Sequence, residues 1–301
     1  MSVRSEILAL KKEQSAVILA HNYVAGEIQD IADFCGDSLE LSVKAKNVSA
    51  PVIVFCGVRF MAETAKILSP DSKVLLPHPG AGCPMADMAD AASVREMRSR
   101  HPGAVFCAYV NSTAETKAEI DICCTSGNVE TVLASIPAEK EIVFLPDGNL
   151  GANMIRKTGR NMVLWQGCCP VHDAVTPEMI RAARTLHPGV EVLVHPECRP
   201  EVVEAADRAL STGGMLKYVR GSSAKSFIVG TECGILHRLR KENPDKAFYT
   251  LSPEPVCADM KKLTPEHVLA ALKTGREEIR LPADVMEKAR LPIERMIAAG
   301  R

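Results

Sequence analysis

Val17-Ile-Leu-Ala-His21-Asn-Tyr23 is the stretch of sequence that decides the fold, because its pattern occurs twice more along the chain. The other copies are Val105-Phe-Cys-Ala-Tyr109-Val-Asn111 and Val190-Glu-Val-Leu-Val-His195-Pro-Glu197. Each copy is a short apolar run, rich in β-branched residues, that ends in polar side chains. Such runs are typical of buried parallel strands.

Further landmarks keep the same register in all three copies. Seventeen residues separate His21 from Ser38, Tyr109 from Ser126, and His195 from Thr212. A cysteine (Cys83, Cys169 or Cys257) follows each first anchor by 62, 60 and 62 residues, respectively. Two more apolar runs lie between the landmarks in every copy, at 51–55 and 73–76 in the first. Agreement at this many positions indicates a triplicated α/β module.

The repeat predicts the fold class α/β, with three similar parallel-sheet αβα domains and right-handed crossovers. We expect repeats at 12–84, 85–170 and 171–260, with terminal helices at 1–11 and 261–301 packing on the core. In the C-terminal tail, Pro292 is expected to break the helical pattern. A pseudo-threefold arrangement would gather the carboxyl ends of the strands, where parallel sheets bind ligands, around one central cluster and active site.

Composition and charge argue against several classes of function. The 301 residues carry a formal net charge of −1 and only 4% are aromatic, so neither a basic nucleic-acid footprint nor a base-stacking platform is expected. No apolar run reaches the roughly 18 residues that a membrane span needs. The first residues also lack the long apolar segment of a signal peptide. We therefore expect a cytoplasmic protein that binds neither nucleic acid nor a membrane.

Three of the eleven cysteines stand out by position. Cys83, Cys169 and Cys257 lie in Gly/Pro-rich loops after strands, where the backbone can approach a cofactor closely. Three equivalent thiolates suit an iron–sulfur cluster, and three ligands leave one iron of a [4Fe-4S] cluster open to substrate. The alternatives are a structural zinc site with His172 as fourth ligand, and three cysteines that are simply buried.

Polar residues at the strand ends and helix starts predict the ligand. Ser38, Ser126 and Thr212 each precede a helical pattern and are expected to be helix N-caps. Three helix N-termini directed at one place would bind an anion, so substrates with carboxylate or phosphate groups are predicted. His and Tyr side chains bind carboxylates, and Glu, His or Tyr can carry protons. The strand-end residues expected in this pocket are His21, Asn22, Tyr23, Tyr109, Asn111, His195 and Glu197.

Over nearly the whole chain, these motifs resemble the quinolinate synthases, in particular the short form of that family. The resemblance rests on Leu19-Ala-His21-Asn-Tyr23, Gly80-Ala-Gly-Cys83, Trp165-Gln-Gly-Cys-Cys169-Pro-Val-His172, His195-Pro-Glu197-Cys and Glu254-Pro-Val-Cys257-Ala-Asp-Met260. It implies a triangular arrangement of three α/β domains. It also implies an enzyme of NAD biosynthesis that condenses iminoaspartate with dihydroxyacetone phosphate to quinolinate, with loss of phosphate and water. The implied supplier of iminoaspartate is an aspartate-oxidising enzyme.

The resemblance also implies roles for single residues. One [4Fe-4S] cluster would be held by Cys83, Cys169 and Cys257, since the family spacing Gly-x-Cys-x-Val-His selects Cys169 over Cys168. Catalytic roles are implied for Tyr23, Tyr109, His195 and Glu197. Substrate contacts are implied for His21, Asp37, Ser38, Tyr109, Asn111, Ser126, His195, Pro196, Glu197, Thr212 and Gly213. Longer family members carry a Cys-x-x-Cys-x-x-Cys run associated with a regulatory disulfide, but Cys257 stands alone, so that switch is not expected.

Two rival functions stay open. Another [4Fe-4S] hydro-lyase, acting on a dicarboxylate, would share the open iron and the anion site but would need no second, phosphorylated substrate. The non-enzymatic rival is an iron–sulfur or redox sensor. A polar pocket with His21, Tyr109 and His195, and the lack of a helix-turn-helix signal, argue against a sensor.

Overall fold

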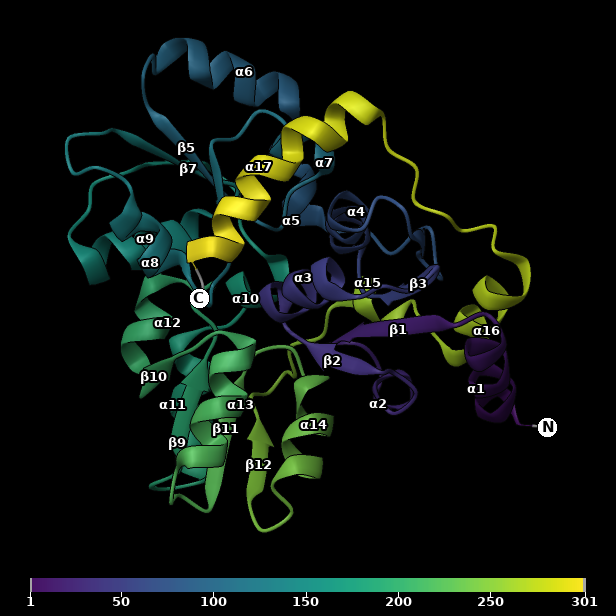
Figure 1. Cartoon of the computed structure of the whole chain (residues 1–301). Helices are drawn as coiled ribbons and strands as arrows, with labels where there is room; N and C mark the ends of the chain where they lie inside the picture. The colour runs from purple at the N-terminus through teal and green to yellow at the C-terminus, as the bar shows by residue number, and fades with distance from the viewer. Residues whose placement is uncertain (1, 300–301) are drawn as a thin grey trace.

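Three four-stranded sheets organise the protein, and the computed structural model describes residues 2–299 of it. Each sheet has the same order, with the second strand of its unit at one edge, followed by the first, third and fourth. All pairings between neighbouring strands are parallel. Figure 1 shows three lobes, each with one sheet and its helices. The predicted α/β class with three parallel sheets is confirmed, while the pseudo-threefold symmetry and the domain boundaries stay predictions.

The strands repeat in groups of four along the chain. The first sheet contains β1 (Ala16–His21), β2 (Phe34–Gly36), β3 (Val52–Cys56) and β4 (Lys73–Leu75). The second contains β5 (Val105–Tyr109), β6 (Ile122–Cys124), β7 (Ile142–Leu145) and β8 (Val163–Leu164). The third contains β9 (Glu191–Val194), β10 (Arg208–Ala209), β11 (Ser226–Gly230) and β12 (Ala247–Thr250). The edge strands β2, β6 and β10 were not among the predicted apolar runs, because two or three residues are too short to show a pattern.

Helices connect and cover these strands. Those of the first unit are α1 (Val3–Glu13), α2 (Gly26–Gln29), α3 (Ser38–Asn47), α4 (Arg59–Leu68) and α5 (Pro84–Asp87). The second unit has α6 (Ala91–Arg100), α7 (Ala114–Lys117), α8 (Val129–Ser135), α9 (Gly148–Thr158) and α10 (Pro170–Asp173). The third has α11 (Pro177–Leu186), α12 (Pro200–Ala205), α13 (Thr212–Gly221), α14 (Ile235–Glu242) and α15 (Ala258–Lys261). The chain ends with α16 (Pro265–Thr274) and α17 (Ala283–Ala299).

An aspartate before each edge strand makes the same backbone contact in all three units. Asp33, Asp121 and Asp207 accept, through Oδ2, the N–H of a residue on the neighbouring first strand, at 2.8, 2.8 and 2.7 Å. Each aspartate also donates its own N–H to the carbonyl of that same residue. A buried N–H without an acceptor is costly, and the aspartate supplies the acceptor for this N–H where the pairing with the edge strand begins. The triplication therefore extends to single hydrogen bonds.

The helix before each first strand supplies a basic partner for that aspartate. Lys11 of α1 pairs with Asp33 at 2.7 Å, while Arg98 of α6 and Arg184 of α11 pair with their own aspartates at 2.9 Å. Helix α1 thus holds the place in the first unit that α6 and α11 hold in the other two. It also packs against α16, and the Gln14 side chain donates to the Leu272 carbonyl at 2.8 Å.

The C-terminal helix α17 differs from its prediction at Pro292. It runs without a break through this proline, although a proline in a helix removes one backbone hydrogen bond. Burial explains the continuity, because Ala289, Pro292, Ile293 and Met296 all face the core. The helix packs on α4, α7 and β6, so it joins elements of the first two units (Figure 1).

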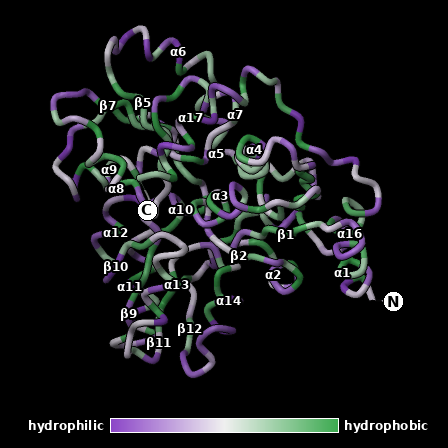
Figure 2. The backbone as a smooth tube through the Cα atoms, viewed as in Figure 1, coloured by the Kyte–Doolittle hydropathy of each residue, from purple (hydrophilic) through white to green (hydrophobic). Residues whose placement is uncertain are grey.

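Apolar residues concentrate in the strands and the helix faces that cover them. Hydrophobic colour marks central strands such as β5 and β7 in Figure 2, whereas hydrophilic residues are frequent in the outer helix α6 and the peripheral loops. The strands read as nearly continuous apolar runs because helices cover both of their faces. Within residues 2–299, no helix has both the length and the apolar character of a membrane span.

Candidate active site

One cavity of about 440 Å³ collects side chains from all three units. It contains the three predicted cysteines Cys83, Cys169 and Cys257. Of the predicted substrate and catalytic residues, it is lined by His21, Tyr23, Asp37, Ser38, Tyr109, Asn111, Ser126, His195, Glu197 and Thr212. Pro196 and Gly213 are not among its lining residues. Pro196 instead accepts a hydrogen bond from Asn153 through its carbonyl at 2.9 Å.

Each of the three cysteines immediately precedes a four-residue helix. Cys83 stands before α5, Cys169 before α10 and Cys257 before α15. Burial raises the pKa of the Cys83 thiol to about 12 and also raises the pKa values of Cys169 and Cys257. Backbone N–H groups of the following turn lie on the side of each sulfur and oppose that rise in pKa. Each sulfur is thus held at a helix start in a largely buried setting, where the thiol keeps its proton unless a bound metal replaces it.

His21 and His195 have the same local geometry at the ends of two first strands. In each, the ring Nδ1 accepts the backbone N–H of the residue two positions later, at 3.2 Å for His21 and 3.3 Å for His195. The proton of the neutral ring therefore lies on Nε2, which in His195 faces the Ser126 hydroxyl at 3.2 Å. Burial lowers the pKa of both rings to about 3. Both histidines are consequently neutral hydrogen-bond donors at neutral pH.

A chain of hydrogen bonds runs from Thr212 to Glu197. The Thr212 hydroxyl donates to the Tyr23 oxygen at 2.9 Å, and the Tyr23 and Thr231 hydroxyls lie 2.7 Å apart. Thr231 Oγ1 lies 2.8 Å from His172 Nε2, and His172 Nδ1 lies 2.8 Å from Glu197 Oε2. With Glu197 ionised, all hydrogen bonds of this chain run the same way. Thr212 donates to Tyr23, Tyr23 to Thr231, Thr231 to His172, and His172 to the carboxylate.

Glu197 is the anionic end of this chain. Burial works against its charge, but the imidazoles of His195 and His172 and hydrogen bonds from His172 and Tyr109 hold the pKa of its carboxyl below the usual value. The Tyr109 hydroxyl donates to Glu197 Oε1. For the phenols burial prevails, and it raises the pKa values of Tyr23 and Tyr109 well above the usual value. The cavity therefore holds a charged carboxylate beside phenols that keep their protons.

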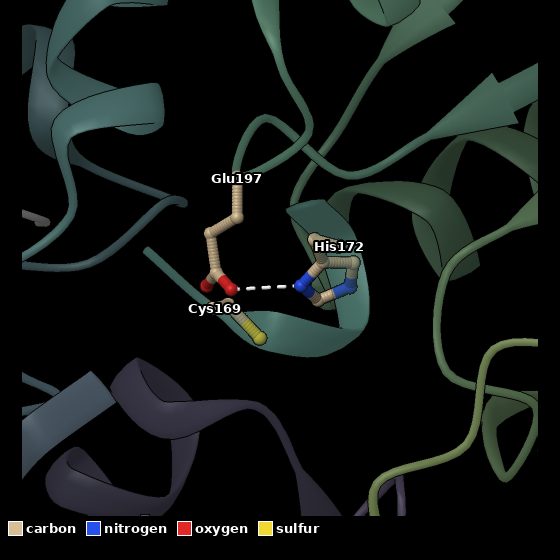
Figure 3. Close-up of side chains that lie close together, drawn as sticks. All are labelled: Cys169, His172 and Glu197. Atoms are coloured by element: carbon tan, nitrogen blue, oxygen red, sulfur yellow. Dashed lines mark hydrogen bonds and ion pairs between the residues drawn. The ribbon is translucent and has the colours of Figure 1, made fainter. Parts of the chain in front are cut away.

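Cys169, His172 and Glu197 form one group that is compact enough for a metal ion. Their ligand atoms lie within 4.8 Å of one another, and Figure 3 shows the Glu197 carboxylate pointing at the His172 ring beside the Cys169 sulfur. Both ring nitrogens of His172 are engaged, one by Glu197 and the other by Thr231. A zinc ion with His172 as a ligand would have to break one of these hydrogen bonds. The geometry favours His172 as a member of the hydrogen-bonded chain.

Comparison with known proteins decides the family. A family model described as quinolinate synthetase A protein matches residues 5–298. The chain belongs to the quinolinate synthase family. Proteins named quinolinate synthase from Methanoregula boonei and Dehalococcoides mccartyi are 51% and 52% identical to it, over 98% of this chain and 98% and 97% of theirs. One from Pelobacter propionicus is 49% identical over 99% of this chain and 98% of its own.

The predicted N-caps of this quinolinate synthase family member were wrong by one or two residues. Helix α3 is capped by Asp37, whose Oδ1 accepts the N–H groups of Leu39 and Glu40, and α13 is capped by Ser211. Helix α8 begins after Asn128, without a side-chain cap. The cause is that Asp37 and Ser211 also satisfy the cap preference and stand one residue earlier.

The shifted caps leave the N–H groups and hydroxyls of Ser38 and Thr212 available to the cavity. Ser38 and Thr212 become the first residues of their helices, so their N–H groups have no intrahelical acceptor and their hydroxyls are free of capping. Asp37 also has a second contact. Its Oδ2 accepts the Gly213 N–H at 3.2 Å, which joins the first and third units. The side chain of Asp37 is thus already engaged by backbone donors.

Sequence reasoning missed three polar residues that complete the site. Thr231 and Glu232 directly follow β11, and Lys261 ends α15. None of the three was among the site residues predicted from the sequence. The signal was available, because carboxyl ends of parallel strands gather functional side chains whichever strand they follow. The predicted site residues follow the first, second and fourth strands of each unit, whereas Thr231 and Glu232 follow the third strand of theirs.

Proposed function

We propose that the protein condenses iminoaspartate with dihydroxyacetone phosphate to form quinolinate, with release of phosphate and water. The observation that carries this proposal is that three cysteines and a set of neutral polar donors, repeated in three units, line one cavity. Membership of the quinolinate synthase family supports this reaction. A cavity of about 440 Å³ has room for small anionic substrates together with a cofactor.

Cys83, Cys169 and Cys257 would hold one [4Fe-4S] cluster. They fit such a group because all three line the cavity and each stands directly before a four-residue helix, at equivalent places in the three units. When bound, the cluster would supply a Lewis-acidic iron without a protein ligand, to which a substrate oxygen can bind.

The neutral donors of the cavity would bind and orient the substrate anions. His21 and His195 can each donate from Nε2 to a carboxylate, and the hydroxyls of Ser38 and Ser126 lie in the same cavity. The Asn111 side-chain oxygen is buried and has no hydrogen-bond partner within residues 2–299, so it suits an N–H group of the substrate. Holding two substrates in register lowers the entropic part of the barrier.

The chain from Tyr23 to Glu197 would move the protons of the condensation. If Tyr23 takes a proton from substrate, its own hydroxyl proton can pass to Thr231, and that of Thr231 to His172 Nε2. The resulting imidazolium would be stabilised by the Glu197 carboxylate at 2.8 Å. The reverse movement would deliver a proton from Tyr23 to a leaving oxygen. One chain of residues therefore serves as base and then as acid.

The same proposal places the reaction in the cytoplasm, next to an enzyme that oxidises aspartate. Iminoaspartate is an imine and hydrolyses in water, so its supply and its use have to be close. The cavity draws its lining from three separate units, which suits exclusion of water around such a substrate.

The test is quinolinate formation by anaerobically purified protein with a reconstituted cluster. Product should require both substrates and should be lost on exposure to air. Cys169→Ser should lose bound iron and activity, whereas the adjacent Cys168→Ser, as the matched control, should keep both. No product from a sample with an intact cluster would contradict the proposal and favour the hydro-lyase that acts on a single dicarboxylate.

A further inference from the structure

Glu232 is a fully buried carboxylate that the proposed reaction does not use. It directly follows Thr231 and has no exposed surface. Its Oε1 accepts the N–H of Cys257 at 3.1 Å, and its Oε2 accepts the N–H of Gly234 at 2.7 Å. A buried carboxylate is retained only with such partners, because an unpaired charge in the interior is very costly.

Lys261 is the cation that pairs with this carboxylate. Its Nζ lies 2.8 Å from Glu232 Oε1 and donates to the Tyr23 carbonyl at 2.6 Å. Lys261 also ends the short helix α15 that starts after Cys257, and its N–H donates to the Cys257 carbonyl at 3.2 Å. One lysine therefore contacts the backbone of both a proposed cluster ligand and the proposed acid–base tyrosine.

The backbone of Tyr23 packs directly on the same segment. A Cβ atom at Gly234 would lie 2.6 Å from the Tyr23 carbonyl oxygen, so no other residue fits at Gly234 without displacing the tyrosine. Gln29 reinforces this contact by donating to the Gly234 carbonyl at 2.9 Å. At the far end of the same side chain, the Tyr23 hydroxyl lies 2.7 Å from Thr231. Residues 231–234 therefore hold Tyr23 at both its backbone and its phenol.

We propose that Glu232 and Lys261 act as one positioning pair that fixes the Cys257 loop relative to Tyr23. Glu232 lines the cavity, but backbone N–H groups and the Lys261 ammonium engage both of its carboxylate oxygens, so we assign the pair no part in the chemistry itself. The pair sets the place of two groups that take part in it, because one carboxylate oxygen receives both the Cys257 N–H and the Lys261 ammonium. This inference rests on the proposed function, since it takes Cys257 as a cluster ligand and Tyr23 as the proton carrier.

Two variants break the pair in different ways. Lys261→Met keeps the length of the side chain and removes both donor contacts, to Glu232 and to Tyr23. Glu232→Gln keeps the shape, but its amide would direct an N–H₂ group at one of the present donors. Lys261→Arg keeps the charge with a different donor geometry, so it should recover part of the function. The matched control is Lys241→Met, which breaks the 2.5 Å pair with Asp30 between the same two units, where the lysine side chain is 65% exposed.

The experiment measures two properties of the anaerobically reconstituted full-length protein. One is the rate at which a chelator removes the cluster iron, and the other is kcat and KM for quinolinate formation. Loss of a supporting contact around a metal ligand weakens metal binding by about 10- to 100-fold, so iron release should accelerate on that order in both variants. A small displacement of Tyr23 should lower kcat by roughly tenfold or more, with KM little changed. Lys241→Met should resemble the parent in both properties.

The double variant separates a positioning pair from two independent braces. If Glu232 and Lys261 act as a unit, Glu232→Gln combined with Lys261→Met should be no worse than the more affected single variant. Effects that multiply in the double variant, or single variants that match Lys241→Met, would overturn the inference while the parent stays active. A parent protein that binds no cluster and makes no quinolinate would overturn the proposed function first, and this inference with it.

Discussion

The ends of the first strands in the first and third units share a backbone design and differ in one side chain. His21 and His195 both accept a backbone N–H at Nδ1, and burial lowers both pKa values to about 3. The residue two positions later is Tyr23 in one unit and Glu197 in the other. The pKa of the phenol is raised by burial, whereas that of the carboxyl is held down by its imidazole neighbours and hydrogen bonds.

This difference shows how a repeated fold can build an asymmetric site. The repeat fixes where two donors and two following side chains stand, and the identity of each following side chain sets its charge. Tyr23 keeps its proton and Glu197 has lost its own. Thr231 and His172 connect the two side chains. Pairs of groups whose environments separate their pKa values are the usual means of dividing acid and base roles.

The largest expected effect comes from removing the charge at the third-unit end of this comparison. Glu197→Gln cannot stabilise an imidazolium at His172, and its amide N–H₂ would face the Tyr109 or His172 donor. We expect kcat for quinolinate formation to fall by about 1,000-fold, within the usual range for a lost acid–base function. Steady-state kinetics of the reconstituted protein measures this, with the exposed Glu204→Gln as control. A variant with kcat within about twofold of the parent would remove Glu197 from the proton path.

The corresponding change at the first-unit end should have a smaller effect. Tyr23→Phe keeps the ring but removes the hydroxyl that lies 2.7 Å from Thr231. We expect kcat to fall by about 100-fold with little change in KM, because water can partly replace a lost proton carrier. Tyr249→Phe, which alters a tyrosine stacked on His187, should leave both constants unchanged. An increase in KM without loss of kcat would instead indicate that Tyr23 only binds substrate.

The repeat made the fold and most of the cavity predictable. Apolar runs that recur in register identify parallel strands, and strand ends identify where ligands bind, so the sequence alone places His21, Tyr109 and His195 in the cavity. The three cysteines were found in the same way. A repeat gives each landmark three chances to be recognised, which a single strand pattern does not.

Details that depend on one or two residues were not predictable. The edge strand β10 has only Arg208 and Ala209, and the caps shifted because Asp37 and Ser211 compete with their neighbours. His172 belongs to the proton chain through its contact with Thr231, 59 residues away, which no local pattern encodes. Pro292 stays helical because tertiary packing outweighs the local penalty.

The feature that the first and third units share, a buried neutral histidine at the end of the first strand, can be tested through the pH dependence of stability. Because the folded pKa of these histidines is near 3, the unfolded chain takes up protons below about pH 6.5 that the folded chain refuses. Stability should therefore fall as pH decreases below that value, by up to about 1.4 kcal/mol per pH unit for each histidine. Urea unfolding of the apo-protein between about pH 5 and 7.5 should show a smaller slope for His195→Asn than for the parent. The same slope in both proteins would mean that His195 is not held neutral, and His78→Asn serves as the control.

The smallest expected effect separates capping from chemistry at the start of α13, where the first and third units again share a design. Ser211 caps the helix through the Gly214 N–H at 3.1 Å, whereas the next residue, Thr212, donates to Tyr23 at 2.9 Å. Ser211→Ala should lower the free energy of unfolding by about 1 kcal/mol and leave kcat near the parent value. Thr212→Val should lower kcat and leave the free energy of unfolding near the parent value, because it keeps the shape but leaves the Tyr23 oxygen without its donor. If Thr212→Val lost stability and Ser211→Ala lost activity, the roles of the two neighbours would have to be exchanged. The original cap prediction would then have been right for this unit.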